Sequence, residues 1–142
     1  MADRHAEAAL LSYPYEAPDF GAGIEVAPGV LWLRFPLPMA LDHVNLYAFD
    51  EGDSWTLVDA GMRWPKGLEA WDALVEGPLQ GKPISRLICT HHHPDHVGLA
   101  GRLQRAGAEL LMTRVAWLTA RMLILDVEAE YPAETVAFYR RA

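Results

Sequence analysis

The sequence predicts an α/β fold (of the α+β kind), in which helices flank a mixed β-sheet. Three observations support this prediction. Short strand-like runs separated by turn residues fill the first half of the chain, and helical and strand-like patterns alternate in the second half. Hydrophobic residues make up 51% of the 142 residues, and five are Trp, which is typical of a globular chain with a real core.

Three apolar runs in the first half of the chain predict strands. The first is Val30–Phe35, which follows a Pro-Gly turn signal and is closed by prolines. The second is Val44–Phe49, and the third is Trp55–Val58. The intervening residues 50–53 (DEGD) are typical turn formers, so the second and third strands are expected to form a hairpin.

The N-terminal segment, residues 1–23, predicts a loose arm, and we expect the folded domain to comprise residues 24–142. The arm contains two prolines and two glycines, and its acidic residues interrupt any apolar core that a secretory signal would need. No apolar run in the chain approaches the roughly 18 residues that span a membrane, so no membrane contact is expected.

Helices and strands alternate from Pro65 onward. Proline suits a first helical turn, the apolar residues that follow have helical spacing, and Gly77 ends the pattern. Further on we expect a strand at Ile84–Thr90, a helix at Val97–Ala106, a strand at Glu109–Thr113, a helix at Val115–Leu125 and a short helix at Ala133–Arg141. The helix at Val115–Leu125 is apolar nearly all round, which is typical of buried helices. The expected core therefore includes Trp71, Leu74, Leu118 and Met122.

Four of the six histidines lie in residues 91–96 (HHHPDH), directly after the predicted strand Ile84–Thr90. Histidine and aspartate are ligands for borderline ions such as zinc and iron. A segment so rich in both, at the end of an apolar strand, indicates a metal site rather than a polar surface turn.

The spacing of these residues predicts two pairs of ligands. Side chains alternate in an extended segment, so His91 and His93 fall on one side and His92 on the other. Asp95 and His96 follow as the chain turns toward a helix. Two pairs on one loop favour two adjacent ions over one closed structural site, and His92 is the residue least suited to bind metal.

This segment resembles the His-x-His-x-Asp-His signature of the metallo-β-lactamase-fold hydrolases, and all four signature positions match. Thr90 and Gly98 on either side also suit the signature. Upstream, Asn45 resembles the family's early strand, and residues 57–61 (LVDAG) resemble the strand that ends in Asp and Gly. The resemblance covers residues 24–113, and the flanks look most like the glyoxalase II-like hydrolases.

The resemblance implies the N-terminal half of an αββα sandwich and a dinuclear metal site. In such a site His91 and His93 hold one ion, and Asp95 and His96 hold the second. Zinc is the expected metal, with iron or manganese as alternatives. Asp59 is expected to accept the other N–H of a ligand histidine and so to orient the site, the alternative being a structural role in the turn before Gly61.

The chain falls short of the family pattern after His96. The family's second half supplies a further histidine for each metal and usually a bridging Asp, whereas this sequence contains no histidine beyond His96. A catalytic zinc site needs three protein ligands and an open position. We therefore expect half a site, on the front portion of a longer hydrolase. Truncation, cleavage and a natural short form remain equal alternatives.

The predicted function is that of a metal-dependent hydrolase. Water activated by the ions would attack a thioester, lactone or other ester of a small molecule, with Asp95 steering the water. One alternative is a phosphodiester hydrolase of the same fold, which the net charge of −7 and the lack of a basic patch disfavour, as they do any nucleic-acid partner. The other is a non-catalytic truncated fragment or dimerisation module that retains the metal loop.

Two further expectations concern assembly and location. Half a sandwich leaves apolar surface uncovered, so we expect a homo-oligomer with Leu118, Met122 and Leu125 near the contact. Cys89 is the only cysteine, which fits a reducing compartment and hence the cytoplasm. Because its neighbours are apolar, Cys89 is expected to be a buried core residue rather than a reactive one.

Overall fold

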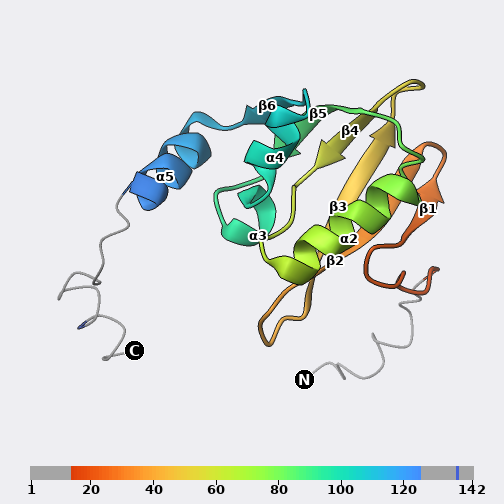
Figure 1. Cartoon of the computed structure of the whole chain (residues 1–142), viewed down its shortest axis with the longest axis horizontal. Coiled ribbons are helices and arrows are strands. Elements are labelled where there is room, and N and C mark those ends of the chain that lie inside the picture. The colour runs from red at the N-terminus through yellow and green to blue at the C-terminus, as the bar shows by residue number, and fades with distance from the viewer. Residues whose placement is uncertain (1–13, 126–136, 138–142) are drawn as a thin grey trace, which may run out of the picture.

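A single six-stranded mixed sheet organises the chain, with α2, α3 and α4 on one of its faces (Figure 1). The computed structural model describes residues 14–125 and Ala137. The elements are β1 (Gly23–Ala27), β2 (Val30–Pro36), β3 (His43–Asp50), β4 (Trp55–Val58), α2 (Pro65–Glu76), β5 (Ile84–Cys89), α3 (Pro94–Val97), α4 (Ala100–Arg105), β6 (Glu109–Met112) and α5 (Arg114–Leu125). The predicted fold class is confirmed. The helix expected at 133–141 lies outside the described residues, except for Ala137.

The strands lie in the sheet in the order of the sequence, from β1 to β6. The first four form an antiparallel meander, and the predicted hairpin of β3 and β4 is confirmed, with Tyr47 opposite Val58. The direction of pairing changes at β4, because β4 pairs with β5, and β5 with β6, in parallel. Parallel pairing needs a crossover, which α2 provides between β4 and β5, and α3 with α4 between β5 and β6.

The core lies between the sheet and these helices. In β3 every second side chain, namely Val44, Leu46 and Ala48, is buried, and those between them are exposed. Helix α2 presents a matching apolar face to the sheet, and its Trp71 and Leu74 are almost completely buried, as predicted. Pro65 begins α2 and Gly77 caps it, so both predicted boundaries are confirmed.

The opposite face of the sheet carries a continuous apolar row that runs across all six strands. Strand register places one residue of each strand in this row: Ile24, Trp32, Tyr47, Val58, Ile88 and Leu111. Tyr47, Ile88 and Leu111 are each 38 to 39% exposed, although cross-strand neighbours usually shield one another. We call this row the open-face row. In the part of the chain that the structure describes, no helix covers it.

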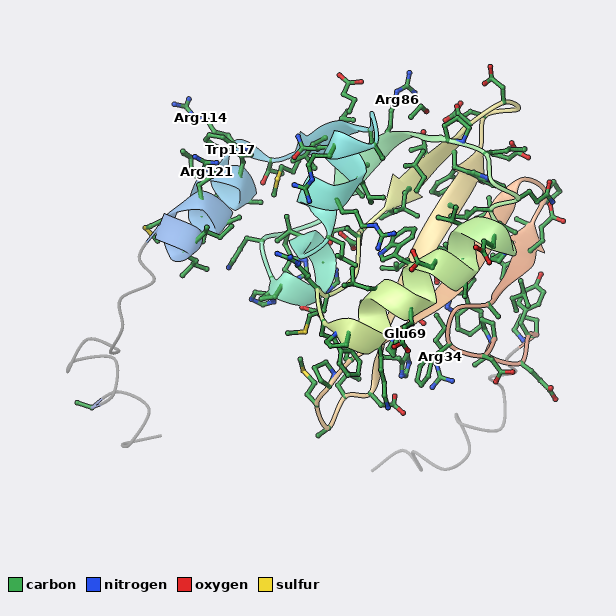
Figure 2. The ribbon with its side chains drawn as sticks, viewed as in Figure 1. Arg34, Glu69, Arg86, Arg114, Trp117 and Arg121 are labelled. Carbon is green, nitrogen blue, oxygen red and sulfur yellow. The ribbon has the colours of Figure 1, made fainter. Side chains whose placement is uncertain are left out.

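The end of the described chain differs most from the sequence prediction. The expected burial of the helix at Val115–Leu125 is wrong, because α5 follows the edge strand β6 and lies beyond the sheet (Figure 1). Leu118 and Met122, expected in the core, are 50% and 53% exposed, and the buried side chains are the small Ala116 and Ala120. Arg114, Trp117 and Arg121 project from this helix (Figure 2).

Smaller differences concern two other segments. Strand β1 was not predicted, although Ile24, Glu25 and Val26 alternate before a Pro-Gly turn. The helix expected at Val97–Ala106 begins earlier and is divided: α3 ends at Val97, and α4 begins at Ala100 after a break at Gly98 and Leu99. No helix among the described residues is long and apolar enough to cross a membrane.

The described part of the N-terminal arm is attached to the sheet rather than loose. The Tyr15 hydroxyl donates to the carbonyl of Val26 over 2.7 Å, and the Gly21 N–H donates to the carbonyl of Arg34 over 3.3 Å. The Arg34 guanidinium also lies 4.7 Å from the centre of the Phe20 ring. The domain boundary expected near residue 23 stays a prediction.

Gly61 offers a test of how tightly the turn after β4 packs. Its φ is +77°, and an added Cβ would lie 2.6 Å from Cε1 of the buried Phe35. Gly52 has a similar left-handed φ of +91°, but a Cβ there would meet no atom within 4 Å. Both positions carry the same kind of backbone penalty for alanine, so the difference between them reports packing alone.

We expect Gly61→Ala to lower the free energy of unfolding by about 1–3 kcal/mol more than Gly52→Ala does, because overpacking moves Phe35. Urea unfolding followed by tryptophan fluorescence measures both variants against the unsubstituted chain. Equal losses in the two variants would show that the Phe35 ring does not constrain this turn.

The structure exposes large apolar surfaces, and the expected homo-oligomer stays a prediction. The open-face row and the outer side of α5 both present large apolar side chains, and such patches favour association between copies. We expect light scattering at low micromolar concentration to show a dimer or larger assembly. Met122→Glu should shift it toward the monomer, whereas Gln104→Glu, which adds the same charge to α4, should not. A stable monomer of the unsubstituted chain would contradict the prediction.

Candidate metal centre

The predicted site residues lie together at one edge of the sheet because β4 and β5 are parallel. Val58 pairs with Ile88 near the ends of these strands, so the residues that follow emerge side by side. Asp59 follows β4, and the histidine-rich loop follows β5. The carboxyl ends of parallel strands are where α/β sheets bind ligands, and both candidate segments are placed there.

The loop after β5 bends at residues 91–93, and from His93 onward it has the conformation that its sequence predicts. His93 is extended, with φ −65° and ψ +147°, and Pro94 occupies the first turn of α3. The backbone N–H groups of His96 and Val97 then donate to the carbonyl of His93 over 3.0 and 2.9 Å. This tight turn folds His96 back over the start of the loop, so that its ring centre lies 4.0 Å from that of His91.

Both predicted ligand pairs come together. Nε2 of His91 lies 3.1 Å from Nδ1 of His93, and Nε2 of His96 lies 3.2 Å from Oδ2 of Asp95. The His92 ring centre is 6.3 Å from that of His91 and 4.8 Å from that of His93, but no hydrogen bond among the described residues joins its ring to either pair, and its side chain lines a neighbouring groove. The division of the loop into four paired residues and one outside them therefore agrees with the alternation expected from the sequence.

Asp59 is buried, with 4% of its surface exposed, and its carboxylate faces the loop. It accepts hydrogen bonds from the Thr90 backbone N–H over 2.8 Å, from the Thr90 hydroxyl over 2.8 Å and from Nδ1 of His96 over 2.8 Å. The backbone of Asp59 is left-handed, with φ +63°, a conformation that non-glycine residues rarely adopt. Such strain is retained where the surrounding structure requires it.

The turn after β4 is fixed from several sides. The buried indole of Trp71 donates to the carbonyl of Ala60 over 2.7 Å, which ties the turn to α2. The N–H of Ala60 donates to the carbonyl of His96 over 2.7 Å, and the N–H of Leu99 donates to the carbonyl of Gly61 over 3.2 Å. The turn and the candidate ligand loop, residues 91–96, are therefore held together by backbone bonds as well as by side chains.

The surroundings of His91 favour its neutral form. Burial lowers the pKa of His91 below its ordinary value of 6.5, and the neighbouring His96 and His93 lower it further, whereas Asp59 and Asp95 act in the opposite direction. A lower pKa means that fewer protons compete for the ring nitrogen near neutral pH. Neutral imidazole is the form of histidine that binds metals.

Cys89 is adjacent to the loop but is not a candidate metal ligand. The side chain is only 2% exposed, as expected for a core residue, and Sγ lies 3.8 Å from the carbonyl oxygen of His96. Burial, with a smaller effect of the Asp59 charge, raises the pKa of the Cys89 thiol to about 12. The thiolate form that binds metals is therefore scarce at neutral pH.

Other histidines and carboxylates lie away from this centre. Nδ1 of His43 contacts Asp42 over 2.6 Å and the Arg34 guanidinium over 3.4 Å. Glu109, on β6, lies 4.0 Å from the guanidinium of Arg86. Asp126 lies outside the described residues. Within residues 14–125, no group of three or more His, Cys, Asp or Glu side chains is arranged to hold one ion.

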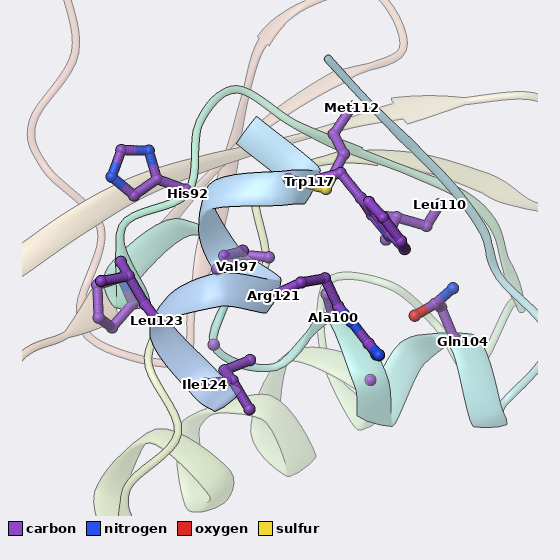
Figure 3. A pocket seen from close by; sticks show the side chains of 14 residues that line it. His92, Val97, Ala100, Gln104, Leu110, Met112, Trp117, Arg121, Leu123 and Ile124 are labelled. Carbon is purple, nitrogen blue, oxygen red and sulfur yellow. The ribbon is translucent and has the colours of Figure 1, made fainter. Parts of the chain in front are cut away.

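A largely apolar groove of about 610 Å³ opens beside the loop (Figure 3). Helix α5 forms one wall with Trp117 and Ile124, and α4 and β6 form the other. His92 and Pro94 of the ligand loop also line it, so the groove adjoins the paired residues. Sequence reasoning did not find it, because it depends on where α5 lies relative to the sheet.

Comparison with known proteins places the chain in a family. The family model described as the metallo-beta-lactamase superfamily matches residues 39–121. The chain is 39% identical over 74 residues to the probable metallo-hydrolase YqjP of Bacillus subtilis, an alignment that covers 49% of this chain and 22% of that protein.

Solved structures show the same similarity. A beta-lactamase domain protein from Burkholderia ambifaria has a TM-score of 0.74 and 35% identity over 83% of this chain and 40% of its own. The metallo-beta-lactamase FIM-1 from Pseudomonas aeruginosa, solved in a mono-zinc form, has a TM-score of 0.57 and 21% identity, over 71% of this chain and 45% of its own. This second likeness concerns the fold alone.

The family match extends over more than half of the chain, and the chain belongs to the metallo-beta-lactamase superfamily. It spans 40% of the Burkholderia protein and 22% of the Bacillus protein. The closer resemblance to glyoxalase II-like hydrolases stays a prediction.

Proposed function

We propose that this chain forms part of a metal-dependent hydrolase with a dinuclear site. His91 and His93 would hold one ion, and Asp95 and His96 the other. The observation that carries the proposal is the short distance between the candidate ligand atoms within each pair. Nε2 of His91 lies 3.1 Å from Nδ1 of His93, and Nε2 of His96 lies 3.2 Å from Oδ2 of Asp95. The family membership supports it, because the similar Bacillus protein is described as a probable metallo-hydrolase.

The distances suit ligands of a common ion. Zinc lies about 2.0–2.1 Å from histidine nitrogen, and two such nitrogens on a tetrahedral ion are roughly 3.3 Å apart. The second pair also brings two acceptors together when the His96 ring is neutral, because its Nδ1–H donates to Asp59 and leaves Nε2 unprotonated toward the Asp95 carboxylate. A cation between these atoms would replace their repulsion with two favourable contacts.

Each pair supplies two ligands, whereas a catalytic zinc site takes three from the protein. Because the described residues contain no group of three, we expect the remaining ligands to come from elsewhere, in a longer polypeptide or in a second copy. Zinc is the proposed ion, with iron or manganese as alternatives.

Hydrolysis of a small-molecule thioester, lactone or other ester is the proposed reaction. Bound ions would supply an acidified water and polarise the substrate carbonyl. The Asp95 carboxylate would accept a hydrogen bond from that water and direct its lone pair, while the apolar groove beside His92 and Pro94 would receive the apolar part of the substrate. The acidic chain and apolar groove disfavour the alternative phosphodiester substrate.

A non-catalytic module that retains the metal loop is the second candidate. It is favoured by one observation, the lack of a three-ligand group among the described residues. The two candidates differ in activity, because both would bind an ion but only the first would hydrolyse an ester.

Zinc binding tests the ligand pairs directly. We expect isothermal titration to show zinc bound to the unsubstituted chain, more weakly than a complete site would bind it, and His93→Ala to abolish most of this binding. His92→Ala is the matched control, because His92 lies in the same loop but outside both pairs. A chain that binds no zinc, or equal losses in the two variants, would refute the assignment of the pairs.

Activity tests the reaction. We expect the zinc-loaded chain to hydrolyse model thioesters and lactones poorly or not at all, because two ligands per ion hold the ions and water imprecisely. Any such activity should fall roughly 10²–10⁴-fold in Asp95→Ala, the usual loss when a group that directs a proton is removed. Rapid turnover by a zinc-loaded monomer would show that the described residues already complete the site, and turnover of phosphodiesters alone would favour the alternative substrate.

A further inference from the structure

Thr90 occupies a position that connects the buried carboxylate with the first metal-ligand candidate. Its hydroxyl oxygen lies 2.8 and 3.0 Å from the two carboxylate oxygens of Asp59. The same oxygen lies 3.0 Å from Nδ1 of His91 and 3.5 Å from Nδ1 of His96. One hydroxyl thus contacts three groups, although it has a single hydrogen to donate.

The direction of these hydrogen bonds follows from counting protons. An ionised carboxylate only accepts, so the Thr90 hydroxyl must donate its hydrogen to Asp59. The contact with His91 then requires the ring to donate from Nδ1 into a lone pair of the hydroxyl oxygen. His91 is thereby held as the Nδ1–H tautomer, and its Nε2 remains unprotonated and faces Nδ1 of His93.

We propose that Thr90 is a positioning residue. Its hydroxyl donates to Asp59 and accepts from Nδ1 of His91, and this bridge fixes the tautomer and orientation of the His91 ring. The relation to metal binding rests on the proposed function, because it concerns the nitrogen that His91 would offer to an ion. The tautomer itself is a property of the chain without metal and can be measured independently.

The arrangement links one carboxylate by hydrogen bonds to a member of each candidate ligand pair. Asp59 accepts directly from Nδ1 of His96, which belongs to the second pair, and acts through Thr90 on His91, which belongs to the first. The two routes differ, since His96 has its own 2.8 Å bond to Asp59 besides the longer 3.5 Å contact with the hydroxyl, whereas His91 reaches Asp59 through the hydroxyl. Removal of the hydroxyl should therefore release His91 and leave His96 in place, a selectivity that a general loss of structure would not produce.

A valine at position 90 removes the hydroxyl and little else. The backbone N–H of Thr90 donates to Asp59 over 2.8 Å and is not altered by a change of side chain, so we expect the turn to retain this main-chain anchor. Thr90 is an exposed residue and valine has a similar shape, so no cavity is created in the core. Serine at this position restores the hydroxyl without the methyl group and is the matched control.

Nitrogen-15 NMR of the histidine rings tests the proposal on the full chain without metal, at a pH above the titration range of histidine. We expect the Nδ1–H tautomer for His91 and His96 in the unsubstituted chain and in Thr90→Ser. In Thr90→Val, His91 should shift toward the Nε2–H tautomer while His96 remains unchanged. An unaltered His91 tautomer in Thr90→Val, or an equal change at both rings, would overturn the proposal.

Zinc affinity provides the second measurement. Loss of a group that orients a metal ligand typically weakens binding by roughly 10- to 100-fold, so we expect a loss of that order in Thr90→Val and near-original affinity in Thr90→Ser. If the unsubstituted chain binds no zinc, the proposed function fails while the NMR result still decides the role of Thr90. If zinc binds and Thr90→Val binds it equally well, the positioning role is refuted and the ligand assignment stands.

Discussion

The hydrogen bonds accepted by the Asp59 carboxylate hold the candidate site together. This side chain lies at the end of β4 and receives donors from the first residue after β5 and from α3. Its backbone is left-handed, and its carboxylate faces the loop, where it meets Thr90 and His96. Three segments that are distant in sequence therefore meet at one buried charge, and the loss of this charge would leave the Thr90 N–H and the His96 ring without their partner.

The two faces of the sheet make different contributions. The covered face supplies rigidity, because Phe35 and Trp71 pack beneath the turn that carries Asp59, and the Trp71 indole binds it directly. The other face contains the open-face row, which no helix covers in the part of the chain that the structure describes. The candidate ligand loop, residues 91–96, lies at the edge of the sheet, so its geometry depends on the packed face, whereas the proposed access of a substrate would use the groove beside α5.

Much of the site could be predicted because its residues are close in sequence or follow strands with a clear pattern. The alternation expected after β5 separated His92 from the candidate ligand pairs, and the resemblance of residues 57–61 to the family's strand indicated Asp59. The hydroxyl bridge of Thr90 could not be predicted, since it depends on the distances between side chains on three segments. The burial of α5 was predicted wrongly because an apolar pattern shows that a helix can be buried, but not whether another layer lies against it.

The change from antiparallel to parallel pairing at β4 has a consequence for how the chain folds. The strands from β1 to β4 are joined by short connections and can pair through local contacts, whereas β4 and β5 pair only after α2 closes a long loop between them. Non-local pairings form slowly because the entropy of loop closure is lost before contacts compensate for it. We therefore expect residues 91–96 to acquire their geometry after strands β1 to β4 have paired, so that the histidines of a nascent chain would meet ions before Asp59 can orient them.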